Sequence, residues 1–328
     1  MRSIHNINSI RIFGLNQSFQ KRTINMPTLH FTTVDVFTTE RYLGNPLAIV
    51  DVPVGDGITD QQMQTIAREF NLSETIFIRE REKAEDGTRQ WRVRIFITTA
   101  ELPFAGHPTI GAACYALGTL AGGESKARLI ANAGNIELEY ADVVAKAAIP
   151  HNFHRLVDYE FTVEDVCGLQ PALKAAGIEP KTVFVASPVK GMNFVNVQLP
   201  DLDALGKVEV TGLKPQPILD AEWNVGFAGS YFYVVSSAEE GVVKVRTRMI
   251  EGIMEDPATG SAACGLSIGL ALEMKLGRTT KFEITLAVEM GRKSDIGVEV
   301  TLNEGLDAAE GVVLSGSAVK VMEGTLEV

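Results

Sequence analysis

The sequence predicts an α+β protein of two similar halves, in each of which β-strands curl around one buried helix. Most of the chain consists of short segments rich in β-branched and aromatic residues, typical of strands. Each half also contains one helical segment that is apolar on nearly every face, as expected of a helix buried on all sides. The two helices lie about 150 positions apart and follow the similar strand sequences Arg-Ile-Phe and Arg-Met-Ile. We therefore expect an internal duplication.

Composition limits the class of protein. A chain of 328 residues allows two domains, and 45% hydrophobic with 22% charged residues is typical of a soluble globular protein. The net charge of −11 argues against a general nucleic-acid binder, although a local site can still bind a small anion. Three cysteines provide no disulfide framework and indicate a reducing compartment. The sequence contains no run of 18 apolar residues, so we expect no membrane span.

The first 26 residues differ from the rest of the chain. They contain Arg2, Arg11, Lys21 and Arg22 but no acidic residue, a composition typical of a mitochondrial presequence. The alternative is an upstream start codon, with Met26 beginning the domain itself. We accordingly expect a cytoplasmic protein, or a mitochondrial one if residues 1–26 act as a presequence.

The first half contains one surface helix before its buried helix. Residues 59–71 predict it, because Thr59 is a typical N-cap and apolar residues recur at helical spacing after it. The buried helix is expected at 106–120. The expected strands cover 29–39, 73–80 and 90–98, and a turn followed by a short strand is expected within 43–52.

The second half repeats this plan. A short helix is expected at 201–205 and the buried helix at 256–274. The expected strands cover 181–187, 192–200, 229–237, 242–250, 281–292, 295–302 and 311–328.

The two buried helices begin in similar sequences. When they are overlaid on their shared Ala-Ala-Cys, Thr109 falls on Thr259 and Gly106 falls on Asp256. A helix N-terminus carries free N–H groups and a partial positive charge. Two such ends facing one cleft would bind a carboxylate.

Polar side chains stand at both helix starts. Gly106 permits close approach of the backbone to a ligand, while His107, Asp256 and Ser261 supply polar groups. Each also has an ordinary explanation: Asp256 fits an N-cap followed by Pro257, and His107 fits a partly buried histidine. The repetition of one pattern at both starts favours a functional site.

Glu74 is the candidate base. It enters an apolar strand between Leu72 and Ile76, where desolvation can raise a carboxyl pKa toward neutrality. The alternative is a solvated glutamate at a strand edge. Glu101 and Glu255 are competing candidates.

Five segments together resemble the PhzF-like (phenazine biosynthesis PhzF) family. They are VDVFTTERYLGNPLAIV, AREFNLSETIFI, RIFITTAELPFAGHPTIGAA, MEDPATGSAACGL and VEMGRKSDIGVEV, in the family's order from about residue 28 onward. The resemblance implies the diaminopimelate epimerase-like fold, with two pseudo-symmetric domains that are each a β-barrel around a central α-helix. We expect an N-terminal extension at 1–26, a first barrel at 27–146 completed by about 318–328, and a second barrel at 147–317.

The resemblance also implies a reaction. The family's characterised member is an isomerase that shifts a proton on a dihydro-hydroxyanthranilate ring without cofactor or metal. Glu74 matches the family's proton-shuttling glutamate, His107 its GH-motif histidine and Asp256 its EDPATG aspartate. The expected substrate contacts are Asn45, Gly106, Thr259, Gly260 and Ser261.

Two segments depart from the family pattern. RIFITT and RMIEGI replace the usual RIFTP and RMFAP before the two motifs. Neither change removes an expected catalytic residue, but both can reshape the cleft wall and so the choice of substrate.

Two alternatives remain open. A racemase on this fold would place a thiolate at each helix start, but Cys114 and Cys264 are expected two turns into buried helices, beyond the N-terminal field. A non-catalytic binder of a small ligand is the other alternative. The partners we expect are a small carboxylate-bearing metabolite and a second subunit in a homodimer, without nucleic acid, membrane, cofactor or metal.

Overall fold

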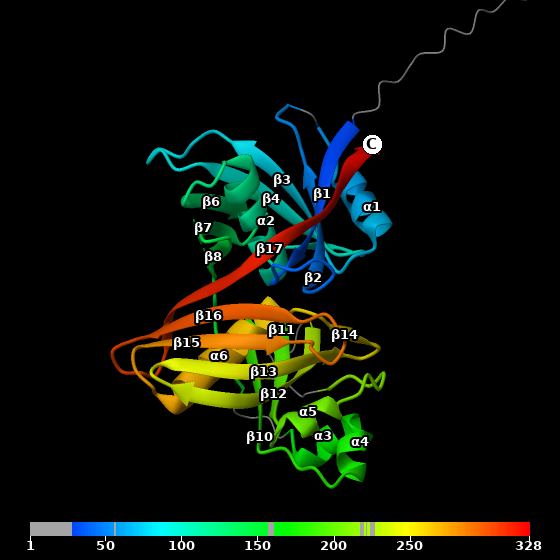
Figure 1. Cartoon of the computed structure of the whole chain (residues 1–328), viewed down its shortest axis with the longest axis vertical. Coiled ribbons are helices and arrows are strands. Elements are labelled where there is room, and N and C mark those ends of the chain that lie inside the picture. Colours follow the sequence, from blue (N-terminus) through cyan, green and yellow to red (C-terminus); the bar gives the residue numbers. More distant parts are fainter. Residues whose placement is uncertain (1–27, 56, 157–160, 217–219, 221, 224–226) are drawn as a thin grey trace, which may run out of the picture.

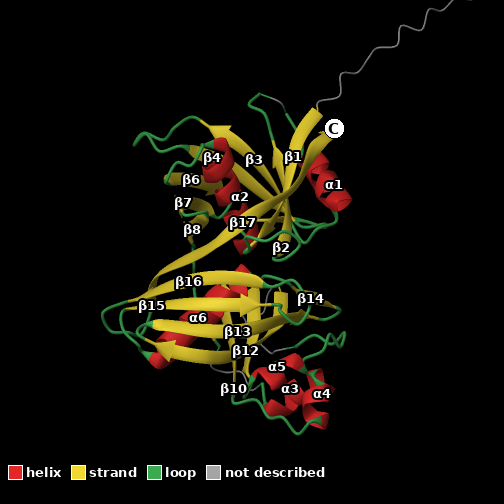
Figure 2. Ribbon diagram, viewed as in Figure 1, coloured by secondary structure: helices red, strands yellow, loops and turns green. Residues whose placement is uncertain are grey.

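The chain forms two lobes stacked along the long axis of the molecule (Figure 1). The computed structural model describes residues 28–328 except 56, 157–160, 217–219, 221 and 224–226. The expectation for residues 1–26 therefore falls outside the described residues. Each lobe has one central helix, α2 above and α6 below, surrounded by strands (Figure 2). The expected α+β fold of two barrels, each around a helix, is confirmed.

The first lobe is a closed barrel of eight strands. The ring closes where β17, the last strand, pairs antiparallel with β1 from Thr28↔Glu327 to Val36↔Ala318. The strands follow one another around the barrel as β1 (Thr28–Val36), β2 (Asn45–Asp51), β3 (Thr75–Arg81), β4 (Gln90–Phe96), β6 (Lys126–Ala131), β7 (Gly134–Ala141), β8 (Val144–Ala148) and β17 (Ala309–Glu327).

The second lobe repeats the first strand by strand. Strands β2 and β3 pair parallel in the first lobe, as β11 and β12 do in the second. The parallel pairing of β4 with β6 likewise corresponds to that of β13 with β15. Its strands are β9 (His154–Arg155), β10 (Thr182–Val189), β11 (Met192–Gln198), β12 (Phe227–Glu239), β13 (Val242–Glu251), β15 (Thr279–Leu286), β16 (Ser294–Leu302) and the start of β17. Two short strands, β5 (Glu101–Leu102) and β14 (Met254–Asp256), follow β4 and β13.

A repeated ion pair fixes the register of the duplication. Arg94 binds Glu101 through two hydrogen bonds of 2.7 and 2.6 Å, and Arg248 binds Glu255 in the same way at 2.8 and 2.7 Å. Both pairs join the same positions of equivalent strands, 154 residues apart. The overlay on Ala-Ala-Cys is therefore wrong by four positions, and Gly106 corresponds to Gly260 rather than to Asp256.

The central helices are buried as expected. All nine residues of α2 (Gly106–Cys114) are buried, and α6 (Gly260–Met274) is buried from Gly260 to Ala271. Small residues allow this packing, since a Cβ on Gly111 would lie 2.5 Å from the Leu47 side chain. The helix expected at 106–120 changes after Cys114 into a π-helix, η1 (Tyr115–Leu120).

The remaining helices lie outside the barrels. The predicted N-cap Thr59 is confirmed, because it forms a capping box with Gln62 at the start of α1 (Asp60–Phe70). The short helices are α3 (Val163–Leu169), α4 (Pro171–Ala175) and α5 (Leu202–Gly206). Within the described residues, no helix combines the length and apolarity needed to cross a membrane.

Candidate active site

The two central helices meet end to end at glycines. A Cβ on Gly106 would lie 3.1 Å from the Gly260 Cα, and one on Gly260 would lie 3.3 Å from the Gly106 Cα. Leu314 of β17 packs against both positions. Glycine at both positions allows this close approach, which brings two partial positive charges to one place.

Glu74 and His107 face each other beside this junction. Glu74 directly precedes β3 and His107 is the second residue of α2, with 3.5 Å between the Glu74 Oε2 and the His107 Nδ1. The Glu74 side chain is 16% exposed and that of His107 is 5% exposed. Burial raises the pKa of Glu74 to about 7, although a hydrogen bond from Ser73 opposes the rise.

Burial acts in the opposite direction on His107. It lowers the pKa of the imidazole to about 4, against the influence of the Asp256 charge and of the Pro46 backbone. The ring is therefore neutral near pH 7. Its Nε2 is buried and has no hydrogen-bond partner among the described residues. A buried nitrogen without a partner is unusual in proteins, which makes the ring a candidate member of the site.

Asp256 completes the group. It accepts hydrogen bonds from the Asn45 side-chain amide at 3.0 Å, the Thr259 hydroxyl at 2.5 Å and the Ala258 N–H at 3.3 Å. Burial raises its pKa and the charge of Glu74 adds to the rise, whereas the Thr259 hydrogen bond and His107 lower it. Of these three contacts, the one from Asn45 joins the first lobe to the second.

The structure corrects the proposed cap. Helix α6 begins at Gly260 after Thr259, so Asp256 is no N-cap and Pro257 is not its first residue. Asp256 instead ends strand β14, which pairs with β13. Sheet pairing, rather than the helix, sets the position of this carboxylate.

The other candidates divide into two groups. Ser261 is buried at the second position of α6, which corresponds to His107 in α2. Thr109 is turned away, because its hydroxyl donates to the Ala105 carbonyl of its own helix. Glu101 and Glu255 are held by their arginines and do not compete with Glu74 as the base.

The cysteines do not resemble activated thiols. Burial raises the pKa of both Cys114 and Cys264 to about 12. Cys264 lies four positions after Gly260, which is about one turn into α6. The prediction that it lies two turns into its helix is therefore wrong. Both thiols are protonated at neutral pH, contrary to what a two-thiol racemase requires.

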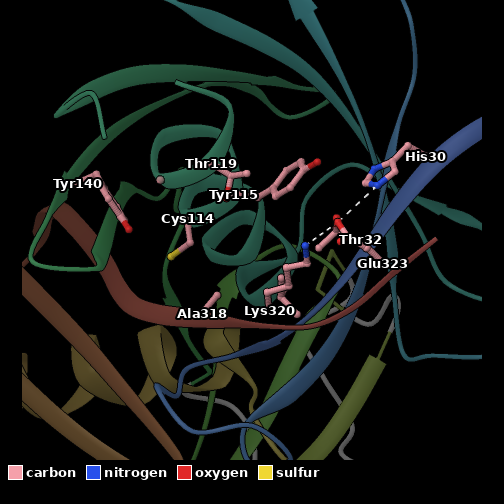
Figure 3. Close-up of a pocket in the computed structure, with 11 residues that line it drawn as sticks. His30, Thr32, Cys114, Tyr115, Thr119, Tyr140, Ala318, Lys320 and Glu323 are labelled. Atoms are coloured by element: carbon pink, nitrogen blue, oxygen red, sulfur yellow. Dashed lines mark hydrogen bonds and ion pairs between the residues drawn. The ribbon is translucent and has the colours of Figure 1, made fainter. Parts of the chain in front are cut away.

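A separate cavity lies in the wall of the first barrel (Figure 3). It has a volume of about 270 Å³ and lies between β1, β17 and η1. His30, Tyr115, Tyr140 and Lys320 are among its lining residues, whereas Glu74, His107 and Asp256 are not. Within the described ranges, no three His, Cys, Asp or Glu side chains form a potential metal site.

Sequence reasoning missed two residues beside the site. Arg292 donates to the carbonyl of Gly44, directly before Asn45, and Ser294 donates to the carbonyl of Pro257, directly after Asp256. Both lie in the segment VEMGRKSDIGVEV, which contributed to the resemblance but received no role. Their side chains act on backbone carbonyls, which leave no pattern in a single sequence.

Comparisons with known proteins place the chain among relatives of one family. The family model described as "Phenazine biosynthesis-like protein" matches residues 34–324. An uncharacterized isomerase of Mesorhizobium japonicum is 33% identical, covering 92% of this chain and 99% of that protein. The trans-2,3-dihydro-3-hydroxyanthranilate isomerase of Pseudomonas chlororaphis is 31% identical, covering 90% of this chain and 99% of that protein. A PhzF-family crystal structure from Bacillus anthracis superposes with a TM-score of 0.72 at 22% identity. The match covers 92% of this chain and 100% of that chain.

Proposed function

The chain belongs to the phenazine biosynthesis-like family and is an isomerase, and from this we propose that it moves a proton on a small carboxylate-bearing substrate by general acid–base catalysis. The observation that carries the proposal is a buried glutamate with a pKa of about 7, facing a neutral imidazole at the junction of two helix N-termini. A base with a pKa near the working pH is most effective in such a transfer.

Glu74 is the proposed base. Its carboxylate removes a proton from a carbon that the substrate's unsaturated or carboxylate-bearing system makes acidic. The resulting carboxylic acid then returns the proton to another carbon on the same face. One carboxyl group suffices for this shift, because it ends the cycle in the form in which it began.

The helix junction supports the substrate. The N-termini at Gly106 and at Thr259–Ser261 provide partial positive charge for the substrate carboxylate and for charge that develops as the proton leaves. His107, which is neutral before the transfer, relays a proton by accepting it at one ring nitrogen and releasing one from the other. Asp256, aligned by Asn45, orients the polar groups around it.

The proposal includes no cofactor or metal, because it assigns the proton transfer to the Glu74 carboxyl group and the stabilisation of negative charge to the two helix N-termini. A homodimer and a cytoplasmic location remain proposals. One feature favours a partner subunit: β17 continues along β1 beyond Ser317, where its pairing with β8 ends. An exposed strand edge of this kind is commonly covered.

The alternatives differ in their requirements. A two-thiol racemase needs thiolates at the helix starts, where this chain has Gly106 and Gly260, so the proposal of proton transfer by Glu74 is better supported. A non-catalytic binder would retain a ligand without exchanging its protons.

Deuterium uptake tests the proposal. The protein is incubated in D₂O with trans-2,3-dihydro-3-hydroxyanthranilate, the compound that appears in the names of its relatives. Other small unsaturated and amino carboxylic acids are tested beside it. Mass spectrometry and NMR follow deuterium at carbon. We expect uptake by the wild type and a loss of about a hundredfold or more in Glu74→Gln, the usual contribution of a general base.

Glu101→Gln is the matched control. Glu101 lies in the same lobe but is held by Arg94, so this variant should retain uptake. A folded Glu74→Gln protein with unchanged uptake would exclude Glu74 as the base. Binding without uptake by the wild type across the panel would favour the binder.

A further inference from the structure

One side chain of the second lobe holds the loop that precedes Asn45. Arg292 follows β15 and donates from Nε to the Gly44 carbonyl at 2.9 Å and from Nη2 to the Leu43 carbonyl at 3.0 Å. The same Nη2 lies 2.9 Å from the Asp35 carboxylate, whose side chain is only 5% exposed. The planar fork of arginine makes such a combined contact possible.

The backbone around Arg292 binds the same loop. The Gly44 N–H donates to the Lys293 carbonyl at 3.0 Å, and the Asp295 N–H donates to the Phe37 carbonyl at 2.8 Å. Gly44 has a φ of +65°, and a Cβ there would lie 2.2 Å from the Val36 carbonyl oxygen. The loop is therefore held in a conformation that only glycine adopts easily.

Two positions along, the same segment binds the other side of the site. Ser294 is fully buried and donates to the Pro257 carbonyl at 2.7 Å, next to Asp256. Between the two anchors, the Asn45 amide donates to the Asp256 carboxylate at 3.0 Å and to the Ala258 carbonyl at 3.2 Å. The contacts form a closed circuit through both lobes.

We propose that residues 292–294 position the Asn45–Asp256 pair. This segment of the second lobe then determines how the Asn45 amide and the Asp256 carboxylate are oriented toward each other. Arg292 and Ser294 are positioning residues, because they contact backbone beside the site and none of the acid–base groups. The consequence for turnover rests on the proposed function, whereas the consequence for Asn45 does not.

A merely stabilising role predicts a different result. If Arg292 only neutralised Asp35, replacing it with another cation would leave Asn45 undisturbed. Arg292→Lys makes this distinction, because lysine keeps the charge but cannot span Asp35 and two carbonyls together. Ser294→Ala removes the second anchor without changing charge.

Arg278→Lys is the matched control. Arg278 also binds one carbonyl and one carboxylate, those of Leu302 at 3.3 Å and Glu310 at 3.0 Å. All three of these residues belong to the second lobe, away from the acid–base group. The control repeats the chemical change without touching the circuit.

The first readout needs no substrate. Hydrogen exchange of the Asn45 side-chain amide is followed by NMR in ¹⁵N-asparagine-labelled protein, with Asn45→Gln used to assign the signal. We expect exchange about tenfold faster in Arg292→Lys and in Ser294→Ala than in the wild type or Arg278→Lys, because the bonds to Asp256 and Ala258 open more often.

The second readout is the rate of deuterium uptake. We expect kcat to fall about tenfold or more in Arg292→Lys with KM within about twofold, as expected when a catalytic group is displaced but binding is kept. If the wild type shows no uptake, the proposed function fails. Hydrogen exchange of the Asn45 side-chain amide still tests the positioning role in that case.

Unchanged Asn45 exchange in folded Arg292→Lys and Ser294→Ala proteins would overturn the proposal. If Arg292→Lys does not fold, Ser294→Ala alone decides, since it removes one hydrogen bond and leaves the Asp35 ion pair intact.

Discussion

At the scale of single residues, two glutamates of one lobe show how environment divides their roles. Arg94 and Asn132 hold the pKa of Glu101 below its usual value. The Glu74 side chain is only 16% exposed, and this partial burial raises its pKa to about 7. The same side chain is thus held as an anion at one position and titrates near neutral pH at the other.

Glu74→Gln should stabilise the protein in a pH-dependent way. The raised pKa means that the folded state binds the proton more tightly than the unfolded state, so stability falls as pH rises from about 4.5 to about 7. The variant lacks this loss. We expect its free energy of unfolding to match the wild type near pH 4 and to exceed it by about 2–3 kcal/mol above pH 7.

Urea unfolding at several pH values checks this expectation. The pKa of His107, lowered to about 4, makes stability fall as pH decreases from 6.5, but it affects both proteins and largely cancels in the comparison. A stability difference that does not grow with pH would contradict the raised pKa of Glu74.

The thiols provide a second residue-scale prediction. Cys114 and Cys264 are buried, whereas Cys167 is partly exposed. In native protein, a thiol reagent should therefore modify Cys167 first and leave deuterium uptake unchanged. Mass spectrometry of digested protein identifies the labelled residue. Rapid labelling of Cys114 or Cys264 with loss of uptake would instead support the racemase.

The sequence could supply the identity of most site residues but not all of their contacts. Glu74, His107 and Asp256 lie together, as their common assignment to one site requires. The cap expected at Asp256 was wrong because a short strand occupies the positions before α6. Arg292 was missed because its partners are carbonyls about 250 residues away.

At the scale of elements, the contact between α2 and α6 determines the geometry of the site. Gly106→Ala should push the helix ends apart, because its Cβ would lie 3.1 Å from backbone that cannot move freely. We expect a loss of about 1–3 kcal/mol in stability and a marked loss of deuterium uptake. Thermal unfolding and the uptake assay measure the two effects.

Gly168→Ala is the control for this change. Gly168 lies in helix α3 and has open space around its Cα, so alanine there should be neutral or slightly stabilising. Equal effects of the two substitutions would show that the helix junction tolerates a side chain.

Apolar residues on nearly every face predicted the two central helices, because each is buried through most of its length. It did not find β6, β7 and β8, whose alternation is mixed with alanine, asparagine and glutamate. These strands become recognisable only in the barrel, where pairing with β4 and β17 buries one face. Tertiary pairing thus supplied what local sequence could not.

At the scale of the whole molecule, β17 joins the lobes. It pairs with β16 in the second lobe, then with β8, and finally with β1 in the first lobe. Removing residues 318–328 should therefore open the first barrel and leave the second intact. Hydrogen exchange with mass spectrometry should show lost protection in β1 and β2 but retained protection in β12 and β13. Uniform protection in the truncated protein would contradict this account.

The duplication was predictable because both halves repeat an arginine before a buried helix. Its register was not, since the shared Ala-Ala-Cys lies at different depths in the two helices. The repeated ion pairs of Arg94 and Arg248 fix it. This register places glycine opposite glycine, where the N-termini of α2 and α6 meet.

The pH dependence of deuterium uptake tests the central claim most directly. With Glu74 as the base, the uptake rate of the wild type should rise with pH, with a midpoint of about 7, and reach a plateau above it. Glu74→Gln should lack this dependence and most of the rate. A midpoint near 4.5 would contradict the raised pKa of Glu74, and the same profile in the variant would show that another group removes the proton.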